Sequence, residues 1–442
     1  MNKIFYLCFL WPAAFTFAQS ASEEDIQIFK EQGFIRYSDL GAKGDGTTDD
    51  IDAIAATHDL ANQHGLQVKA DAGATYYISG KDRTVVVRTD TDFGSASFII
   101  DDTQVENHKA YVFLINSSLQ PFKPVGISTL KKNQKKIDLS FPQPCLITVT
   151  NSERKHYIRF GRNQNQGSAQ TDVFIVSKDG IVDTNTPIIW DFDQITDITA
   201  LPIDEENLSI TGGRFTTIAN QAESQYNYHV RGFGIWRSNV VIENLEHRIT
   251  GEGDHGAPYR GFIHVSDSAN VTVKDYILTG HKTYETIGAA GLPVSMGTYD
   301  ISLTQALNVS FINCSQTNDI RDTRYWGIMG SNYCKNLVLD HCTFSRFDAH
   351  KGVANATIKN STLGHMGINA IGTGTFTVEN TTIYSRRFFN LRADYGSTWQ
   401  GDLFIRDCVF VPTLSENSSP VLVRGSQGLR APDFSGRQLC ML

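Results

Sequence analysis

The chain has 442 residues, and its 47 acidic side chains outnumber its 39 lysines and arginines, which gives a formal net charge of −8 at pH 7. This balance argues against a protein that binds nucleic acid through its overall charge. Glycine occurs 36 times and proline only 12 times, so the composition predicts an ordered chain with many tight turns rather than a disordered one.

The first 18 residues have the layout of a secretory signal peptide. Lys3 precedes an apolar run from Ile4 to Phe17, and the small residue Ala18 follows that run. The run is short for a membrane span, and no later segment approaches the ~20 apolar residues that a transmembrane helix needs. We therefore expect an exported protein of bacterial type, secreted or periplasmic, without a transmembrane segment.

Residues 19–83 are expected to form an N-terminal cap and the first coil of a larger structure. A turn-rich stretch, YSDLGAKGDGTTDD, precedes an amphipathic segment that predicts a helix beginning at Thr48 or Asp49, and the strand-like GATYYIS follows. Residues 84–200 contain several strand-like segments interrupted by polar loops. They are therefore either early coils or an inserted antiparallel β subdomain.

Residues 201–442 contain a repeated pattern. Eight segments, among them NVVIENLEH at 239, NVTVKDYIL at 270, NLVLDHCTF at 336 and NATIKNSTL at 355, begin with a polar residue and continue with apolar residues at alternate positions. The intervals between copies run from 19 to 38 residues, which is typical of a solenoid with loops of variable length. The predicted fold class is all-β, a parallel β-helix solenoid with an N-terminal capping helix.

Like residues fall into columns when the copies are aligned. One column contains Cys314, Cys342 and Cys408. Because parallel, in-register coils place each residue above its counterpart, we interpret these cysteines as small core residues rather than as disulfide partners or metal ligands. The preceding column contains Asn313, His341, Asn360, Asn380 and Asp407.

The stretch from Asp39 to Asp50, DLGAKGDGTTDD, with the helix and strand after it, resembles the N-terminal module of the pectate-lyase-like superfamily of single-stranded right-handed parallel β-helices. The coil repeats extend this resemblance over Asn207 to Phe410. The resemblance implies a right-handed solenoid and a carbohydrate-active protein, since the family includes polysaccharide lyases, glycoside hydrolases, epimerases and phage tailspikes. It does not specify a reaction, and no catalytic motif of the known lyases or polygalacturonase-type hydrolases matches strictly enough to transfer residues.

Outward side chains on neighbouring coils are expected to share one groove, because successive side chains of a strand point to opposite faces. Between Arg321 and Arg406 the sequence has ten lysines and arginines against six acids, which favours an acidic ligand. The catalytic candidates in this groove are Lys351, His350, Arg392, Tyr395, Asp348 and Arg324. The candidates for substrate binding are Asp394, Asn369, His365, Tyr325, Trp326, Asp300 and His264.

Two reactions and one binding role fit these residues. In a β-elimination, Lys351 or His350 removes the proton beside a uronic acid carboxylate, while an arginine (392 or 324) neutralises that carboxylate and a tyrosine (395 or 325) protonates the leaving oxygen. In an inverting hydrolase, Asp348 pairs with Asp394 or Asp300. The third alternative is a non-catalytic solenoid that binds glycans.

The local excess of cations favours the lyase, with an acidic polysaccharide or oligosaccharide as its substrate. No cofactor follows from the sequence, although lyases of the resembled family can use Ca²⁺, for which Asp322, Asp348 and Asp394 are the candidate ligands. The sequence specifies neither the sugar nor the oligomeric state.

Overall fold

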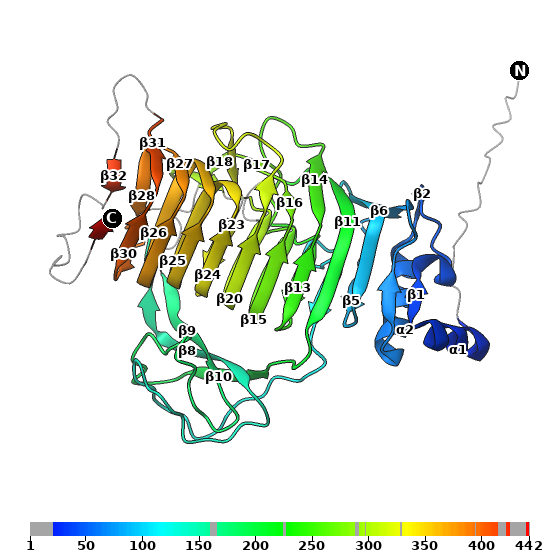
Figure 1. Ribbon diagram of the computed structural model, residues 1–442, viewed down its shortest axis with the longest axis horizontal. Helices are drawn as coiled ribbons and strands as arrows, with labels where there is room; N and C mark the ends of the chain where they lie inside the picture. Colours follow the sequence, from blue (N-terminus) through cyan, green and yellow to red (C-terminus); the bar gives the residue numbers. More distant parts are fainter. Residues whose placement is uncertain are drawn as a thin grey trace, which may run out of the picture.

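The chain winds into a right-handed parallel β-helix, which Figure 1 shows for the computed structural model. The structure describes residues 21–159, 166–223, 227–287, 291–296, 298–327, 329–393, 395–413, 421–424 and 439–441. The predicted signal peptide lies outside these residues. The predicted fold class, an all-β solenoid with an N-terminal capping helix, is confirmed.

The N-terminal cap closes one end of the helix. It contains α1 (Glu23–Gln32), β1 (Phe34–Arg36), the 3₁₀ turn η1 (Tyr37–Leu40), β2 (Asp45–Asp49) and α2 (Ile51–His64). The sequence prediction missed α1, and α2 begins after Asp50 rather than at Thr48 or Asp49. Among the described residues, no helix is both long and apolar enough to cross a membrane.

The acidic cluster of the cap holds turns together. The Asp50 carboxylate accepts backbone N–H groups from Lys43 and Gly44, at 2.6 and 3.0 Å. The Asp45 carboxylate accepts those of Thr47 and Thr48. These bonds satisfy backbone donors that no helix or sheet pairs, which is the role that short acidic side chains often have in turns.

Each coil crosses three faces, and on each face the strands pair in parallel with those of neighbouring coils. The ladder face, toward the reader in Figure 1, is named after the asparagines that precede its strands. It comprises β1, β3 (Gln67–Lys69), β13 (Val240–Glu243), β24 (Lys335–Asp340), β30 (Leu403–Arg406), β33 (Leu439–Met441), the first parts of β6 (Thr91–Asp101) and β11 (Leu208–Ile218), and the last parts of β15 (Ile263–Lys274), β20 (Ile301–Ile312), β25 (Thr343–Lys359) and β26 (Thr362–Glu379).

The second face follows the ladder face around each coil. It comprises β2, β4 (Thr75–Ile78), β14 (Glu246–Thr250), β16 (Ile277–Leu278), β21 (Ser315–Gln316), β27 (Thr382–Tyr384), β31 (Val409–Val411), the last parts of β6 and β11, and the first parts of β25 and β26.

The third face is the groove face, because the predicted groove residues lie on or beside it. It comprises β5 (Val85–Val87), β7 (Phe113–Asn116), β12 (Phe233–Trp236), β23 (Met329–Asn332), β28 (Arg387–Leu391), β32 (Val421–Arg424), the first parts of β15 and β20, and the middle parts of β25 and β26. β29 (Trp399–Gln400) pairs with β26 beyond it. Two small antiparallel pairs lie in the loops between the second face and the groove face: β17 (His281–Lys282) with β22 (Tyr325–Gly327), from two different coils, and the hairpin of β18 (Tyr284–Ile287) with β19 (Pro293–Met296).

The inside of the helix is filled by stacked apolar side chains. Phe98 lies over Phe215 and Phe113 over Phe233, each pair with ring centroids 4.7 Å apart and nearly parallel planes. That separation is about one strand spacing, as in-register parallel coils require. Cys314 and Cys342 are buried in this core and Cys408 is half-buried, and all three are free thiols.

Two columns of residues at the coil corners, one of them the predicted Asn313 column, have positive φ angles. Asn308 and its counterparts donate side-chain hydrogen bonds from one coil to the next, at 2.8–3.1 Å. Asparagine tolerates the left-handed conformation better than most residues and keeps an amide for the ladder. The positive-φ corners are Asn239, Asn270, Asn308, Asn336 and Asn355 in one column and Asn313, His341, Asn360, Asn380 and Asp407 in the other.

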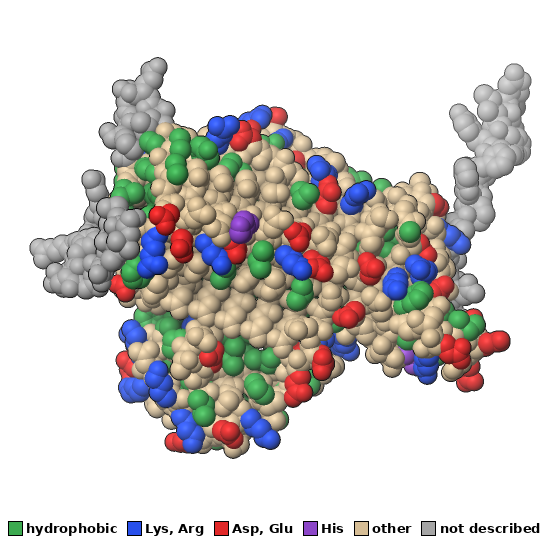
Figure 2. Space-filling model, viewed as in Figure 1, with side chains coloured by type: hydrophobic (Ala, Val, Ile, Leu, Met, Phe, Trp, Pro, Cys, Tyr) green, Lys and Arg blue, Asp and Glu red, His purple; other side chains and the backbone are tan. Residues whose placement is uncertain are grey.

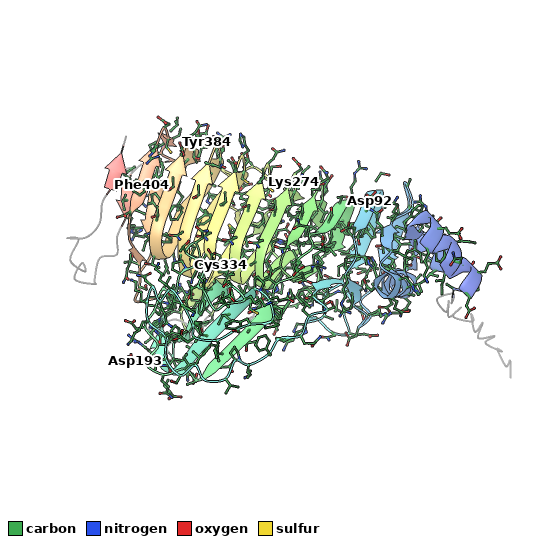
Figure 3. The ribbon with its side chains drawn as sticks, turned by 60° about the horizontal axis from the view of Figure 1, so that its bottom comes forward. Asp92, Asp193, Lys274, Cys334, Tyr384 and Phe404 are labelled. Atoms are coloured by element: carbon green, nitrogen blue, oxygen red, sulfur yellow. The ribbon has the colours of Figure 1, made fainter. Side chains whose placement is uncertain are left out.

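An antiparallel insert leaves the helix after β7 and returns before β11. Its sheet contains β8 (Cys145–His156), β9 (Ser168–Val176) and β10 (Asp197–Pro202), and it has an apolar core of its own. Figure 3 brings the insert forward, with Asp193 in one of its outer loops and Cys334 on the adjoining coils. Next to Cys334, Lys335 forms an ion pair of 2.7 Å with Asp172 of β9, and both side chains are buried. The insert is therefore docked on the corner between the groove face and the ladder face.

Candidate active site

The floor of the groove face consists of two columns of outward side chains. Phe233 and Ile235 point into the core, so Gly234 and Trp236 point out, and the same alternation holds on the coils that follow. The first column contains Gly234, His264, Ser302, Gly330, Asp348, Asn369 and Asn390. The second contains Trp236, Ser266, Thr304, Asn332 and Lys351.

A wall borders this floor on each side. On one side the insert reaches Lys351, whose Nζ donates to Ser168 Oγ of β9 at 3.4 Å. On the other side lie the loops that connect the second face to the groove face, and tyrosine rings from these loops pack on the floor. A Cβ at Gly234 would lie 2.8 Å from the ring of Tyr111, so this position needs glycine for the ring to pack there.

Tyr395 is the centre of a cluster at the C-terminal end of the floor. Only 3% of it is exposed, and its hydroxyl shares a hydrogen bond of 3.0 Å with His350 Nε2. His350 Nδ1 donates to Asn332 Oδ1 at 3.0 Å, which leaves Nε2 as the acceptor of the tyrosine proton. Three cations lie 5.1–5.9 Å from the centroid of the Tyr395 ring: Arg159, Lys351 and Arg392.

Lys351 is the partly buried amine of this cluster. A β-bulge at His350 sets it opposite Asn332, and Gly352, with φ +62°, turns the chain directly afterwards. The Tyr157 hydroxyl of the insert and the Tyr333 ring would lie 3.0 and 2.9 Å from a Cβ at Gly352. Burial lowers the pKa of Lys351 from 10.5 to about 8, because the charged amine loses its water.

Asp348 lies on the predicted column, but arginines cover it. Its carboxylate bonds to Arg346 and to Arg392, the latter at 3.4 Å, and only 1% of the residue is exposed. Its neighbour in register, Asn369, accepts a 2.7 Å bond from the Asn390 amide. Asp348 therefore lies on the outward column, but its carboxylate is paired with two guanidinium groups rather than open to solvent.

Solved structures with low sequence identity share this fold. The tailspike of Pseudomonas phage phi297 has a TM-score of 0.51 and 13% identity, with 89% of this chain and 72% of that chain covered. The tailspike of the Acinetobacter baumannii bacteriophage AP22, solved with a capsular saccharide of A. baumannii, has a TM-score of 0.45 and 9% identity, over 91% and 77% of the two chains. The endo-xylogalacturonan hydrolase of Aspergillus tubingensis has a TM-score of 0.37 and 12% identity, over 90% and 98%.

The likeness shows the fold, a right-handed parallel β-helix. No protein-family model matches the sequence, and no curated protein matches it. The residues of the site therefore have to be argued from this chain.

A second group of predicted residues lies at the outer edge of the loop wall. His365 Nε2 hydrogen-bonds to the backbone oxygen of Tyr325 at 2.7 Å, and burial lowers the pKa of this histidine. Arg324 is 76% exposed and pairs with Asp322 at 2.6 Å. These residues border the groove, whereas Tyr395, His350 and Lys351 lie inside it. Two further candidates, the whole of Asp394 and the side chain of Trp326, lie outside the described residues.

Asp300 does not point into the groove, so that prediction is wrong. The residue is 0% exposed and bonds to His247 Nδ1 and the Tyr276 hydroxyl, each at 2.6 Å. The prediction assumed that side chains alternate between inward and outward, which holds only within a strand. β20 begins one residue after Asp300, and Asp300 lies at the corner beneath the loops. Burial lowers the pKa of neighbouring His281, but its contacts with Asp300 and Glu252 outweigh that effect and raise the pKa to about 9.

His264 lies on the predicted column but is buried. Its Nδ1 hydrogen-bonds to the Tyr111 hydroxyl, and burial lowers the pKa of His264 to about 3. The histidine is therefore neutral at physiological pH, and it supports the floor from beneath the aromatic side chains.

Two of the three calcium ligands suggested by the resemblance do not fit a metal site, and the third, Asp394, lies outside the described residues. Asp348 is bonded to two arginines and Asp322 to Arg324, so their oxygens are already paired with cations. Within the described ranges, no three His, Cys, Asp or Glu side chains are grouped as a metal ion would require.

The ladder face is a poorer candidate because its charges are balanced. One row of outward residues across this face contains both signs of charge: Glu243, Lys274, Asp340, Lys359 and Glu379. Figure 2 shows blue and red side chains alternating over this face. Lys274 pairs with Glu243, and Lys359 pairs with Asp340 at 3.2 Å. An open hollow of about 550 Å³ lies at one edge of this face, but ladder residues with both signs of charge line it.

The sequence analysis missed part of the cluster. Arg346 precedes Asp348 by two positions and therefore shares its face, so strand alternation was a usable signal for it. Arg159, Tyr157 and Ser168 come from the insert, and no pattern in the sequence indicates which coil the insert contacts.

Proposed function

We propose that the groove face binds an acidic polysaccharide and cleaves it by β-elimination. The observation that carries this proposal is the charge of the Tyr395 cluster. Within the described part of the chain, four cations surround Tyr395 and the single carboxylate Asp348: Arg159, Arg346, Lys351 and Arg392. A partly dehydrated site with this excess of positive charge favours a ligand that carries carboxylates.

The side chains of the cluster can divide the chemical steps among them. Lys351, with a pKa of about 8, supplies a neutral amine near that pH, which can take the proton beside the uronic acid carboxylate. Arg392 or Arg346 neutralises the carboxylate as the enolate forms. The Tyr395 hydroxyl turns its proton from His350 Nε2 to the leaving glycosidic oxygen while the carbon–oxygen bond breaks, and the phenolate that remains lies among the surrounding cations.

The inverting hydrolase has less support. Such an enzyme needs one protonated carboxyl group and one free carboxylate. The Asp348 carboxylate is held by two arginines, and Asp300 is sealed beneath the loops, so neither is placed to act on a substrate. The partly buried Lys351 disfavours the passive glycan-binding alternative. Removing water from a charged amine costs free energy, and an exposed amine would bind an anion without that cost.

Secretion or export to the periplasm is part of this proposal and depends on the predicted signal peptide.

The test is a panel of uronic acid polymers: alginate, polygalacturonate and hyaluronan. We expect one of them to give an unsaturated, ultraviolet-absorbing product. Lys351→Ala should lower kcat by about 100-fold or more. Lys359→Ala is the matched control, because Lys359 lies in the same strand but on the ladder face, and it should behave as the wild type.

Two outcomes would contradict the proposal. Reducing ends that form without the unsaturated product would assign the groove to a hydrolase. Binding of a polymer without any product would favour the passive glycan-binding solenoid.

A further inference from the structure

β12, four coils away from Lys351 on the groove face, carries an exposed indole, that of Trp236. It is 40% exposed, and it is the one aromatic side chain among the large apolar residues that are exposed in the described part of the chain. Phe233 and Ile235, its neighbours in β12, point into the core, so the indole stands on the groove face. An exposed tryptophan beside a polar floor is unusual enough to suggest a ligand.

Trp236 lies in the same column as Lys351. Between them the column passes Ser266, Thr304 and Asn332, so four strand spacings separate the two side chains, or about 19 Å. The intervening side chains are short and polar: Thr304 and Asn332 are half-buried and offer hydrogen-bonding groups along this track, whereas Ser266 is only 4% exposed and donates to Asp267. That track matches an extended chain of about five sugar units, if each unit advances by about one strand spacing.

The surroundings of Trp236 hold it in place. Its ring lies 6.4 Å from the His264 ring in an edge-to-face arrangement, and His264 in turn bonds to Tyr111. Tyr111 packs on Gly234, the outward residue two positions before Trp236. These contacts form a preorganised aromatic group, which is the kind of surface that offers a sugar ring a flat apolar face at low cost in ordering.

We propose that Trp236 is a platform on which a sugar ring of the bound chain stacks, about four units away from the sugar at Lys351. The proposal rests on the proposed function in one respect, namely that a glycan lies along the groove face. It identifies the substrate class as oligomers of about five or more units and polymers, because shorter chains cannot contact Trp236 and Lys351 together. Trp236 is thus a binding residue that sets chain-length preference.

The experiment compares Trp236→Ala, Trp236→Phe and the wild type on the polymer that the panel identifies and on its size-fractionated oligomers. We expect Trp236→Ala to raise KM for the polymer about tenfold, as the loss of one aromatic contact would. The increase should become smaller as the oligomers fall below about five units, and Trp236→Phe should recover much of the affinity. Ile287→Ala, at an exposed apolar residue in the β18–β19 hairpin, is the control.

A second readout does not depend on cleavage. The tryptophan fluorescence of wild type, Trp236→Phe and Trp236→Ala is titrated with alginate, polygalacturonate and hyaluronan. A change in the wild type that both variants lose supports the platform even if no polymer of the panel is cleaved, in which case only the proposed lyase activity fails. An equal change in KM at every chain length, or a wild-type KM in Trp236→Ala while the polymer is cleaved, overturns the platform and leaves the lyase intact.

Discussion

Burial between the insert and the coils changes the acid–base chemistry of Lys351. Its pKa of about 8 lies below the ordinary lysine value of 10.5. Below pH 8 the Lys351 amine is charged in the folded protein, where it is less well solvated than in the unfolded chain. The unfolded chain binds the proton more tightly, which means that this lysine destabilises the fold fully below pH 8. The penalty disappears as the pH rises from about 8 toward 10.5. A residue that lowers stability at neutral pH is expected where it has a chemical task.

The first prediction concerns the pH dependence of Lys351. The reactive form is the neutral amine, so kcat/KM should rise about tenfold per pH unit below pH 8 and level off above it. Lys351→Arg keeps the positive charge but does not lose its proton, so it should lower kcat by about 100-fold across the whole range. Initial rates between pH 6 and 10 would measure both effects. A rate that falls as the pH rises through 8, or an active Lys351→Arg variant, would rule out lysine as the base.

Single residues also mark the limit of strand alternation as a predictor. Alternation placed Asp348, Asn369 and His264 in the correct column, since each lies within a strand. It failed at Asp300, which precedes its strand and turns into a buried histidine network. It also did not indicate that Arg392 and Tyr111 cover Asp348 and His264, because these two side chains come from other segments.

At the scale of elements, the asparagine corners both turn the chain and join the coils. Asn308 has a φ of 55°, donates to Asn270 Oδ1 at 2.9 Å and accepts from Asn336 at 2.8 Å. The recurrence of asparagine at this position was readable from the sequence, because a left-handed corner in every coil selects the same residue type. The bulge that brings His350 and Lys351 side by side has no such signature, since it interrupts the repeat only once.

The second prediction separates the two roles of Asn308. Asn308→Ala loses both ladder bonds and puts a residue that disfavours the left-handed conformation where asparagine tolerates it, so it should lower the free energy of unfolding by about 2–3 kcal/mol. Asn308→Gly loses the same bonds without the backbone strain and should cost about 1 kcal/mol less. Urea denaturation would measure both, with Ser310→Ala, two positions on in the same strand, as the control. Equal losses for alanine and glycine would show that the backbone conformation contributes little.

For the whole molecule, the sequence predicted the β-helix but not how the insert packs against the coils. The coil repeat and the Asp39–Asp50 module were enough for the solenoid and its cap, because a one-dimensional repeat leaves its period in the sequence. For residues 84–200 the sequence left two alternatives, and the structure has coil strands up to Asn116 followed by the insert. The docking of the insert brings Arg159 beside Tyr395, a contact between residues far apart in the chain that no local pattern encodes.

The last prediction is that the buried ion pair between Lys335 and Asp172 keeps the site assembled. Both side chains are about 1% exposed, and the pair is one of the few charged contacts between the insert and the coils. Lys335→Met would leave the Asp172 carboxylate buried without a cation, which typically costs about 3–5 kcal/mol. The insert should therefore loosen and withdraw Ser168 and Arg159 from Lys351 and Tyr395. Activity should fall, and protease cleavage within residues 117–203 should become faster while the coils stay resistant.

Two comparisons separate this effect from a general loss of stability. The double variant Lys335→Met with Asp172→Asn removes the unpaired charge, so it should recover part of the stability and of the activity. Lys123→Met breaks an exposed pair with Asp197 in the same insert and should have no measurable effect, because solvent already screens that pair. If Lys335→Met loosens the insert but leaves kcat and KM as in the wild type, the insert is not a wall of the active site, and the cluster around Tyr395 must work from the coils alone.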